Sequence, residues 1–356
     1  MRVPFDTLKA QLVAILTAWG MSEEHARITA ERMGAADIRG IDSHGATMMQ
    51  LYAEQFAAGL INVKPDIRIL RQSPVTALID ADHSLGHVPA TQAMELAIAK
   101  AKKTGLAAVA VKQSNHYGSA GAYALMAAEA GLVGMAFTSV WHAVVVPTFS
   151  AEPMFGTNPI SFAAPGKKHP MFYLDMATST AAVGKLKVAN LNGKTVPEGW
   201  ALDTAGNPVT DPARALEKVL LTPLGATRTM GSHKGYGLGA MVEVLCSMIP
   251  GAWFAPTRDV RHPGEKHNNI GHFFLAMDPD AFRDEGEFEE DLDDMIDALH
   301  AVRPIDPTQP VLVPGDPEQT AMKDRLAKGV PVPDMLIGQL KAIATNAKAP
   351  WLIGPA

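Results

Sequence analysis

The chain has almost no cysteine, since Cys246 is the only one among its 356 residues. A single cysteine excludes an internal disulfide framework and a zinc site built from several cysteines. Long apolar runs are also missing. The longest stretch, residues 130–146, is interrupted by Gly131, Thr138 and His142 and falls short of the roughly 20 residues that a membrane helix needs. The first residues lack the apolar core of a secretory signal, so we expect a soluble protein of the reducing cytoplasm.

Basic charge is scarce as well. Lysine and arginine total 31 against 37 acids, for a formal net charge of −6, which argues against nucleic acid as a partner. Residues 284–294 hold eight acids and no base, which leaves a net charge of +2 for the rest of the chain. Because Phe288, Leu292 and Met295 recur at i, i+4 and i+7, this run predicts a helix whose acidic side faces solvent.

A third absence concerns nucleotide motifs. No G-x-G-x-x-G fingerprint follows a predicted strand, and the closest segment, residues 235–239, has the wrong spacing. A P-loop and a G-x-S-x-G elbow are missing too. Any nucleotide that binds is therefore expected to bind outside an ordinary Rossmann crevice.

Hydrophobic residues make up 47% of the chain, enough to bury a large core in about two domains. Helical spacing of apolar residues fills the first sixty positions and returns in the last fifty, while residues between them alternate short strand patterns with helices. We therefore predict a mixed α/β fold, with a helical subdomain of residues 1–73 plus 300–356 and an α/β domain of residues 74–299. The expected strands are 75–80, 107–112, 133–139, 159–164, 171–176 and 272–277, and the main expected helices are 89–103, 119–130, 237–249 (apolar and expected to be buried), 317–328 and 333–347.

Two histidines stand in segments suited to chemistry. His44 lies between glycines just after a helix-capping pair, where the positive end of a helix lowers the pKa of an imidazole and keeps it neutral. His116 lies in the turn from a buried strand to a helix of small residues, a position where ligands collect. Neutral imidazoles near pH 7 donate or accept protons. The alternatives are a histidine that only caps a helix and an ordinary loop histidine.

Other segments favour close backbone contact or metal binding. Lys234 stands among glycines at a helix start, an arrangement that suits either phosphate binding or close packing of the backbone. Residues 156–159 (Gly-Thr-Asn-Pro) predict a turn in which an asparagine precedes the proline. His262 and His267 are five residues apart but lack a carboxylate at matching spacing, so solvated loop histidines are the better interpretation than a metal site.

Seven segments in this order resemble the malate/L-lactate dehydrogenase-like oxidoreductases, a family that includes ureidoglycolate, sulfolactate and diketogulonate reductases. The segments, which span about residues 5–345, are DIRGIDSHGA with LYAEQFAAGLIN, SNHYGSAGAYALMAAEAGLVGMAFTS, FGTNPISFAAPG, DMATSTAAVGK, KGYGLGAMVEVL and NIGHFFLAMDP. The resemblance implies a non-Rossmann, largely antiparallel sheet that binds NAD or NADP, framed by N- and C-terminal helical segments. It also implies a homodimer whose active site draws on both subunits.

The resemblance further implies that hydride moves between C4 of the nicotinamide and C2 of a 2-oxo or 2-hydroxy acid. His44 and His116 match the family's two histidines, one of which protonates the substrate oxygen while the other orients the substrate. The implied substrate-binding residues are Ser43, Met48, Trp141, His142 and Thr157. The implied cofactor-binding residues are Ser139, Asp175, Met176, Ala177, Lys234, Gly235, Asn269, Pro314 and Gly315.

Three departures from the family pattern lie around the expected substrate site. Met48 stands where many members have an arginine that holds the substrate carboxylate, a charge-assisted interaction worth about 1.5–3 kcal/mol. Residues 140–142 (Val-Trp-His) replace a small, proline-bearing stretch, and residues 149–150 replace a glycine pair. Either another base such as Arg39 takes over, or the substrate is less anionic and more apolar.

We therefore expect a cytoplasmic NAD(P)-dependent oxidoreductase with an atypical substrate and no metal. One alternative is reduction of a cyclic imino acid, a pyrroline or piperideine carboxylate, in which hydride goes to C=N. Another is a non-catalytic descendant that binds a nucleotide. A metal-dependent hydrolase that uses His262 and His267 is a distant third.

Overall fold

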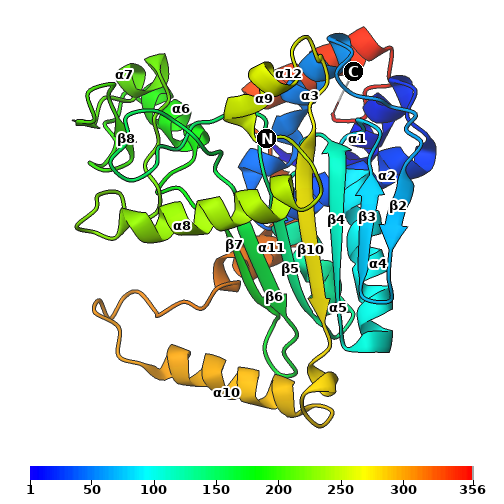
Figure 1. The fold of residues 1–356 in the computed structure, drawn as a ribbon, viewed down its shortest axis with the longest axis vertical. Helices are drawn as coiled ribbons and strands as arrows, with labels where there is room; N and C mark the ends of the chain where they lie inside the picture. Colours follow the sequence, from blue (N-terminus) through cyan, green and yellow to red (C-terminus); the bar gives the residue numbers. More distant parts are fainter. Residues whose placement is uncertain (355–356) are drawn as a thin grey trace.

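A computed structural model describes residues 1–354 as a mixed α/β protein built around one seven-stranded sheet (Figure 1). β3 and β4 run parallel, and the other five neighbouring pairs are antiparallel. The strand order across the sheet is β2 (Arg68–Gln72), β3 (Thr76–Asp80), β4 (Leu106–Ser114), β10 (Ile270–Met277), β5 (Val133–Thr138), β6 (Ile160–Ala164) and β7 (Phe172–Met176).

The central strand β10 comes from late in the chain and lies between β4 and β5. Its register against β4 shifts between Ile270 and His272, which marks a bulge. Gly271 stands at this bulge because a Cβ there would overlap the carbonyl oxygen of Cys246. The bulge thus lies at the end of β10 that precedes the buried His272.

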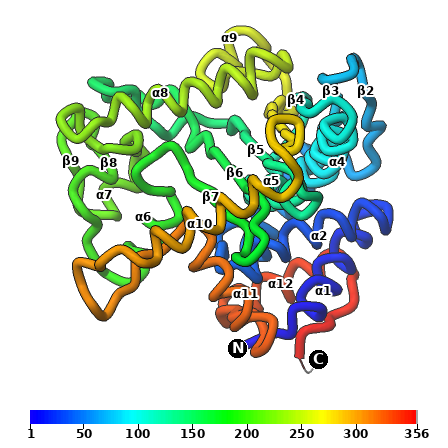
Figure 2. Tube along the Cα trace, turned by 90° about the horizontal axis from the view of Figure 1, so that it is seen from below, coloured from blue at the N-terminus to red at the C-terminus, as the bar shows by residue number. Residues whose placement is uncertain are grey.

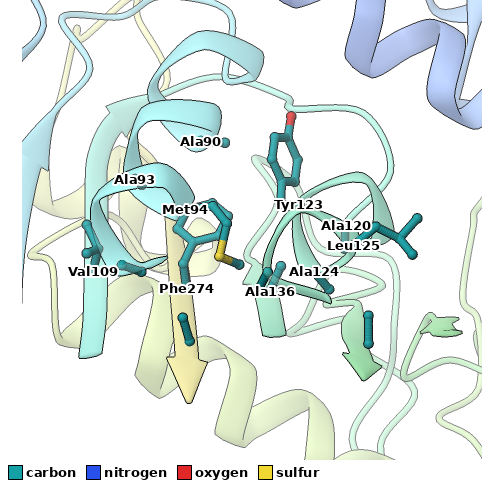
Figure 3. Close-up of a cluster of buried hydrophobic side chains, with 14 of the residues drawn as sticks. Ala90, Ala93, Met94, Val109, Ala120, Tyr123, Ala124, Leu125, Ala136 and Phe274 are labelled. Atoms are coloured by element: carbon teal, nitrogen blue, oxygen red, sulfur yellow. The ribbon is translucent and has the colours of Figure 1, made fainter. Parts of the chain in front are cut away.

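Helices α4 (His87–Thr104) and α5 (Gly121–Glu129) pack against the sheet through small side chains. Figure 3 shows Ala90 and Ala93 of α4 and Ala124 of α5 around Met94 and Phe274. Because alanines leave little space between helix and strand, α5 approaches closely enough that a Cβ at Gly134 would meet the carbonyl of Ala124. The alanine-rich sequence of both helices is therefore a packing feature.

A separate layer of helices joins the two ends of the chain (Figure 2). Ser22 caps α2 by accepting a hydrogen bond from the His25 amide, as the sequence indicates. The two-stranded pair β1 (Arg2–Val3) and β11 (Val330–Pro331) ties the N-terminal to the C-terminal part. The predicted division at residues 73 and 300 stays a prediction. The helices of this layer are α1 (Phe5–Ala18), α2 (Glu23–Ile38), α3 (Met49–Ala57), α11 (Asp316–Lys328) and α12 (Asp334–Ala347).

A lobe of short elements has its own small core of Leu186, Val196 and Leu221. The sequence patterns did not predict its elements, which are α6 (Val183–Leu191), β8 (Ala201–Leu202), β9 (Pro208–Val209) and α7 (Pro212–Glu217). The next helix, α8 (Ser232–Glu243), continues into a π-helical turn, Val244–Met248. The expectation that this apolar segment is buried is right for one side only: Val242 and Cys246 are fully buried, whereas Val244 and Met248 are 52% and 54% exposed.

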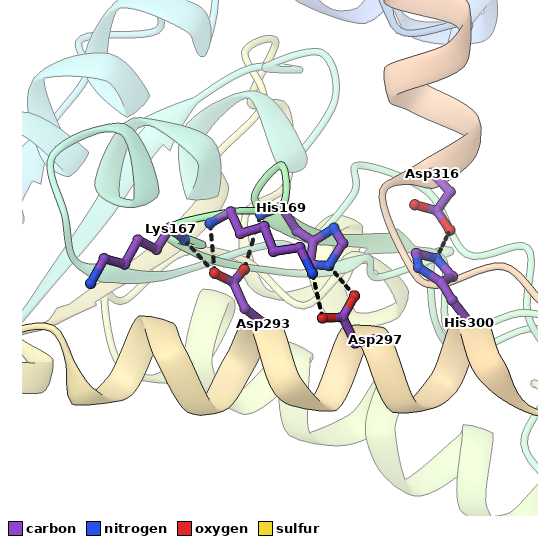
Figure 4. Close-up of polar contacts among 7 residues, drawn as sticks. Lys167, His169, Asp293, Asp297, His300 and Asp316 are labelled. Atoms are coloured by element: carbon purple, nitrogen blue, oxygen red, sulfur yellow. Dashed lines mark hydrogen bonds and ion pairs between the residues drawn. The ribbon is translucent and has the colours of Figure 1, made fainter.

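The acidic run forms α10 (Glu287–Ala301), and most of its acids are exposed as predicted. Asp293 differs, because it is buried and accepts hydrogen bonds from the backbone amides of residues 167–169 (Figure 4). Asp297 pairs with Lys168 and His169 in the same contact. None of the helices described in residues 1–354 is long and apolar enough to cross a membrane.

Candidate active site

His44 and His116 come from different layers and meet in the structure. His44 ends the 3₁₀ turn Asp42–His44, which follows α2, and His116 follows β4 of the sheet. Their rings stack with centroids 5.6 Å apart and an interplanar angle of 25°. The two histidines that the sequence singles out therefore form one site.

Two donors hold the ring of His116. The Tyr52 hydroxyl lies 2.8 Å from Nδ1, and the amide of Gly118 donates to the same nitrogen at 3.3 Å. An amide can only donate, so Nδ1 is the acceptor and the neutral ring carries its proton on Nε2. His116 is thereby prepared to donate a proton from Nε2.

Burial keeps both rings neutral. It lowers the pKa of His116 well below the ordinary value of 6.5, and the neighbouring rings His44, His87 and His272 lower it further. Burial also lowers the pKa of His44, which the Asp175 carboxylate opposes. Neutral imidazoles at physiological pH suit both proton donation and proton acceptance.

Some predicted substrate residues lie beside this pair and others do not. Ser43 places its Oγ 2.8 Å from Nδ1 of His44, and Trp141 meets His116 edge to face with ring centroids 6.0 Å apart. His142 is exposed and lies against Trp141. Met48 instead packs against the helical core, and the carbonyl of Thr157 accepts from Thr178. The contacts of Met48 and Thr157 therefore serve the packing of the fold.

A small hollow opens beside Trp141, and Arg258 is the one charged residue in the described part of the chain that lines it. The sequence patterns did not single out this arginine. Arg258 donates through Nη2 to the carbonyls of residues 265–267, and it lies 5.7 Å from the Trp253 ring. Its Nε is buried and has no partner among the described residues. No spacing signal marks Arg258, because the short helix that it begins, α9 (Arg258–Arg261), reaches the site only through the tertiary fold. The hollow is lined by Val140, Trp141, Trp253, Ala255, Arg258, Asn268, Asn269 and Ile270.

Arg39, the sequence-based substitute for the missing arginine, lies elsewhere. Its guanidinium donates to the carbonyl of Ala35 on its own helix at 3.2 Å. Burial lowers its pKa, and the nearby Glu129 carboxylate acts against this shift. Arg258, and not Arg39, lines the hollow together with Trp141.

The predicted cofactor residues occupy three regions. Asp175 accepts from Ser119 Oγ at 2.6 Å and from the Gly121 amide at 2.9 Å, at the start of α5. Met176 and Ala177 continue from it and are half-buried. The carbonyl of Pro314 accepts a hydrogen bond from the Tyr173 amide, so the Pro314–Gly315 turn lies beside β7, the strand that carries Asp175.

Ser139 and Asn269 lie at the bulged end of β10. Ser139 is buried and its Oγ accepts from the Gly271 amide at 3.3 Å. Asn269 accepts from the Gln113 amide at 2.7 Å and lines the hollow. Both therefore border the segment that carries Trp141.

Lys234 and Gly235 form the third region, in the first turn of α8. Lys234 is exposed, whereas Gly235 is buried where a Cβ would overlap the backbone of Leu224. Gly235 is therefore required by packing against Leu224, whereas the exposed Lys234 and the positive end of a 12-residue helix fit an anionic phosphate group.

The histidines considered for a metal are engaged in stacking. His262 stacks on Trp253 at 4.4 Å, and His267 stacks on His83 at 4.4 Å. Within residues 1–354, no three His, Cys, Asp or Glu side chains are grouped so as to hold a metal ion.

Comparison with known sequences identifies relatives over nearly the whole chain. The family model described as malate/L-lactate dehydrogenase matches residues 3–341. Malate dehydrogenase of Pyrococcus horikoshii is 40% identical over 344 residues, covering 96% of this chain and 94% of the relative. L-sulfolactate dehydrogenase of Methanocaldococcus jannaschii is 36% identical and covers 95% of each. Ureidoglycolate dehydrogenase (NAD(+)) of Escherichia coli O157:H7 is 32% identical over 94% of this chain and 93% of the relative.

Solved structures share the fold. Malate dehydrogenase from Entamoeba histolytica superposes with a TM-score of 0.94 at 32% identity and covers 99% of both chains. Δ1-piperideine-2-carboxylate reductase from Pseudomonas syringae pvar. tomato gives a TM-score of 0.83 at 28% identity, with 97% of this chain and all of the other covered.

Proposed function

The chain belongs to the malate/L-lactate dehydrogenase family of oxidoreductases, and we propose that it moves a hydride between a nicotinamide cofactor and C2 of a 2-hydroxy or 2-oxo acid. The observation that carries this proposal is the stacked pair of neutral histidines, His44 and His116, with the proton of His116 on Nε2. Acid–base chemistry at such a pair supplies the proton that accompanies the hydride.

One of the two histidines supplies or takes up the proton that accompanies the hydride. In the reducing direction a C–H bond forms at C2, the C=O double bond becomes a single bond, and the oxygen takes a proton from a histidine. In the oxidising direction the same histidine removes the hydroxyl proton as the C2–H bond breaks. Bound NAD or NADP supplies or accepts the hydride. His116 is the first choice for the proton donor in this structure, because two contacts fix its tautomer, and His44 then orients the substrate.

The cofactor-binding residues remain those that the resemblance implies. Lys234 supplies a positive charge, and the N-terminus of α8 supplies the helix dipole that phosphates favour. Oδ2 of Asp175 accepts from the Ser119 hydroxyl and the Gly121 amide, so we infer that Asp175 also helps to hold the start of α5 near His44. The sheet has one parallel pair and no glycine fingerprint, which supports cofactor binding outside a Rossmann crevice.

Arg258 takes the place of the missing arginine in this proposal. Its orphaned Nε and its position between Trp253 and the hollow suit a substrate carboxylate, since a buried donor without a partner costs free energy until an acceptor arrives. Trp141 and Trp253 give the rest of the hollow an apolar, planar lining. The proposed substrate is therefore a 2-oxo or 2-hydroxy acid with an apolar substituent.

The two tryptophans also favour a second candidate, reduction of a cyclic imino acid, whose flat ring would stack against them. The structural similarity to a Δ1-piperideine-2-carboxylate reductase supports this alternative. In that reaction hydride goes to the carbon of C=N, and the nitrogen, not an oxygen, takes the proton.

A substrate panel tests the proposal. Oxidation of the reduced cofactor would be followed with 2-oxo acids and cyclic imino acids, for the wild type and for His44→Ala, His116→Ala and His25→Ala. We expect turnover with at least one class, a loss of about 10²-fold or more in the first two variants, and no change in His25→Ala, whose histidine lies on α2. Undiminished turnover in both site variants would refute the assignment, and cofactor binding without any turnover would favour a non-catalytic descendant.

The homodimer also belongs to this proposal. Equilibrium sedimentation of the purified chain would test it, and a mass of one chain at micromolar concentration would contradict it.

A further inference from the structure

A buried carboxylate supports the turn that carries His44. Asp37, on the last turn of α2, is only 4% exposed, although aspartate is rarely buried without a specific partner. Neither the proton transfer nor the cofactor proposal uses this residue. The contacts of Asp37 therefore need an explanation of their own.

The side chain of Asp37 holds the far end of the turn. Its Oδ2 accepts a hydrogen bond from the amide of Ala46 at 2.9 Å. The carboxylate also packs directly against Gly45, where any Cβ would overlap it. Glycine at position 45 is thus required by the close approach of Asp37, and His44 is the residue just before this contact.

Arg325 holds the near end of the same turn. It comes from α11, almost 300 positions later, and its side chain is 12% exposed. Its Nη1 donates to the backbone carbonyl of Asp37 at 2.6 Å and also pairs with the Asp42 carboxylate, while its Nη2 lies 3.2 Å from Asp42 Oδ2. Asp42 begins the 3₁₀ turn that ends at His44.

A cavity of about 340 Å³ borders this clamp. Asp37, Asp42, Ala46 and Thr47 line one side. The space is large enough for several waters, so the Asp37 carboxylate can exchange protons with solvent through it. The other lining residues come from α1, β11, α12 and the segments beside them: Met1, Leu8, Val330, Pro331, Val332, Pro333 and Leu336.

We propose that Asp37 is a positioning residue for His44: in its charged form it fixes Gly45 and Ala46, Arg325 fixes Asp42, and together they hold the His44 ring opposite His116. This inference rests on the proposed function in one respect, the part that His44 plays in the reaction. Asp37 and Arg325 touch no reacting group and act only through the turn.

The charge state of Asp37 gives the clamp a distinct pH signature. Burial is the main cause that raises the pKa of Asp37 from 3.8 to about 7; the Ala46 amide and Arg325 act against this rise, and nearby Asp42 adds to it. Burial lowers the pKa values of His44 and His116 from their ordinary 6.5, so a transition near pH 7 separates Asp37 from both histidines.

The groups that face Asp37 from its neighbours are few. Asp42 comes from the turn and Arg325 from α11, whereas the cavity residues of α1, β11 and α12 are apolar. The amino group of Met1 is 3.6 Å from Asp334 and forms an ion pair with it.

Asp37→Asn tests the inference, with Asp324→Asn as the matched control. Asp324 is an ion-paired carboxylate on α11 that contacts Arg2 and Lys328, not the turn. In the wild type kcat/KM should rise through pH 7. In Asp37→Asn this rise should disappear and kcat at about pH 8 should fall roughly tenfold, as expected for loss of a charge-assisted hydrogen bond. The Kd for the reduced cofactor should stay within about twofold, since the proposed phosphate site is on α8. A wild-type pH profile in Asp37→Asn would overturn the proposal.

A second measurement is independent of turnover. Hydrogen exchange of the Ala46 amide, corrected for intrinsic pH dependence, should be slow above pH 7 in the wild type and in Asp324→Asn. It should be at least about tenfold faster in Asp37→Asn. Equal protection in all three proteins would refute the clamp, whereas altered exchange in a chain inactive on every substrate would refute only the proposed function.

Arg325→Gln provides a variant that leaves the buried carboxylate in place. It should release the Asp42 end, lower kcat and keep the Kd for the reduced cofactor, and Arg325→Lys should restore part of the loss because it keeps the charge but not the two-pronged contact. Full activity in Arg325→Gln would contradict the role of α11.

Discussion

At the scale of single residues, the chemistry of the site depends on which nitrogen of His116 carries the proton. The Gly118 amide and the Tyr52 hydroxyl both point to Nδ1, and this arrangement leaves the proton on Nε2. Tyr52 lies within the predicted helical segment after His44, but nothing in its spacing reveals the contact with a strand-end residue 64 positions later. The two histidines could be predicted from their glycine-rich surroundings, whereas their partners could not.

Tyr52→Phe should therefore lower kcat about tenfold, because it removes one of the two donors to Nδ1 of His116. The tautomer with the proton on Nε2 then loses roughly 1 kcal/mol of stabilisation. The fold should persist, since the ring stays in the core. Steady-state kinetics on the best panel substrate measure the effect. An unchanged kcat would show that the Gly118 amide alone fixes the ring.

Arg258→Ala should raise KM for the acid substrate about tenfold to a hundredfold, because a charge-assisted contact to the carboxylate is lost. Arg258→Lys should recover only part of it, since lysine cannot reproduce the planar fork. Arg261→Ala, an exposed arginine of the short helix α9 (Arg258–Arg261), is the matched control and should leave KM unchanged. An unaltered KM in Arg258→Ala would remove Arg258 from the substrate site.

At the scale of elements, the spacing of apolar residues and the local composition predicted most of the sheet and the long helices. β3, β5, β6 and β7 agree with the expected strands within one residue, because their apolar runs are bounded by clear turn residues. β2 was missed, since all five of its residues are exposed and carry no core pattern. α6 was missed because its one buried residue, Leu186, packs with residues ten or more positions later, such as Val196 and Leu221.

α8 shows where composition misleads. The apolar composition of residues 237–249 predicted a buried helix, but Met241 of α8 and Val244 and Met248 of the following π-helical turn are exposed. Hydrophobic content alone cannot distinguish the core from a surface, because apolar atoms also supply much of a folded protein's exterior.

The element α10 is attached mainly by polar contacts, and Asp293→Ala should weaken that attachment. The substitution removes an acceptor for the backbone amides of Lys167, Lys168 and His169 (Figure 4), at a cost of about 2 kcal/mol. Limited proteolysis should then cut near residues 302–312 faster than in the wild type. Asp294→Ala, the exposed neighbour, is the control, and equal cleavage of both variants would contradict the role of Asp293.

At the scale of the whole molecule, the site requires every layer. The turn with His44 follows the N-terminal helix α2, and His116 follows strand β4 of the sheet. Arg258 comes from the short helix α9 before β10, and Arg325 comes from the C-terminal helices. The sequence could predict helical ends around an α/β centre, but their contact depends on long-range pairs such as β1 with β11. We propose that the helical layer, residues 1–73 plus 300–356, acts as a subdomain that presents His44 to the sheet.

The raised pKa of Asp37 links the stability of the whole fold to pH. The native state holds the Asp37 proton up to about pH 7, whereas the unfolded chain releases it near pH 3.8. Between these values the native state binds more protons, so its stability falls as pH rises and the contribution is lost through pH 7. The free energy of unfolding of the wild type, minus that of Asp37→Asn, should therefore be about 3 kcal/mol larger near pH 5 than near pH 8. Urea titrations at the two pH values measure it, and a difference that does not change with pH would contradict the raised pKa.

The central claim is that this chain transfers a hydride between the nicotinamide C4 and C2 of an acid substrate. The most direct test uses reduced cofactor carrying deuterium at C4, with the best 2-oxo acid and the best cyclic imino acid of the panel, and mass and NMR analysis of the products. We predict one deuterium at C2 of a 2-hydroxy acid, formed by the wild type and lost in step with turnover in His116→Ala. A product without deuterium at that carbon, or labelling only of the cyclic imino acid, would contradict the proposed reaction.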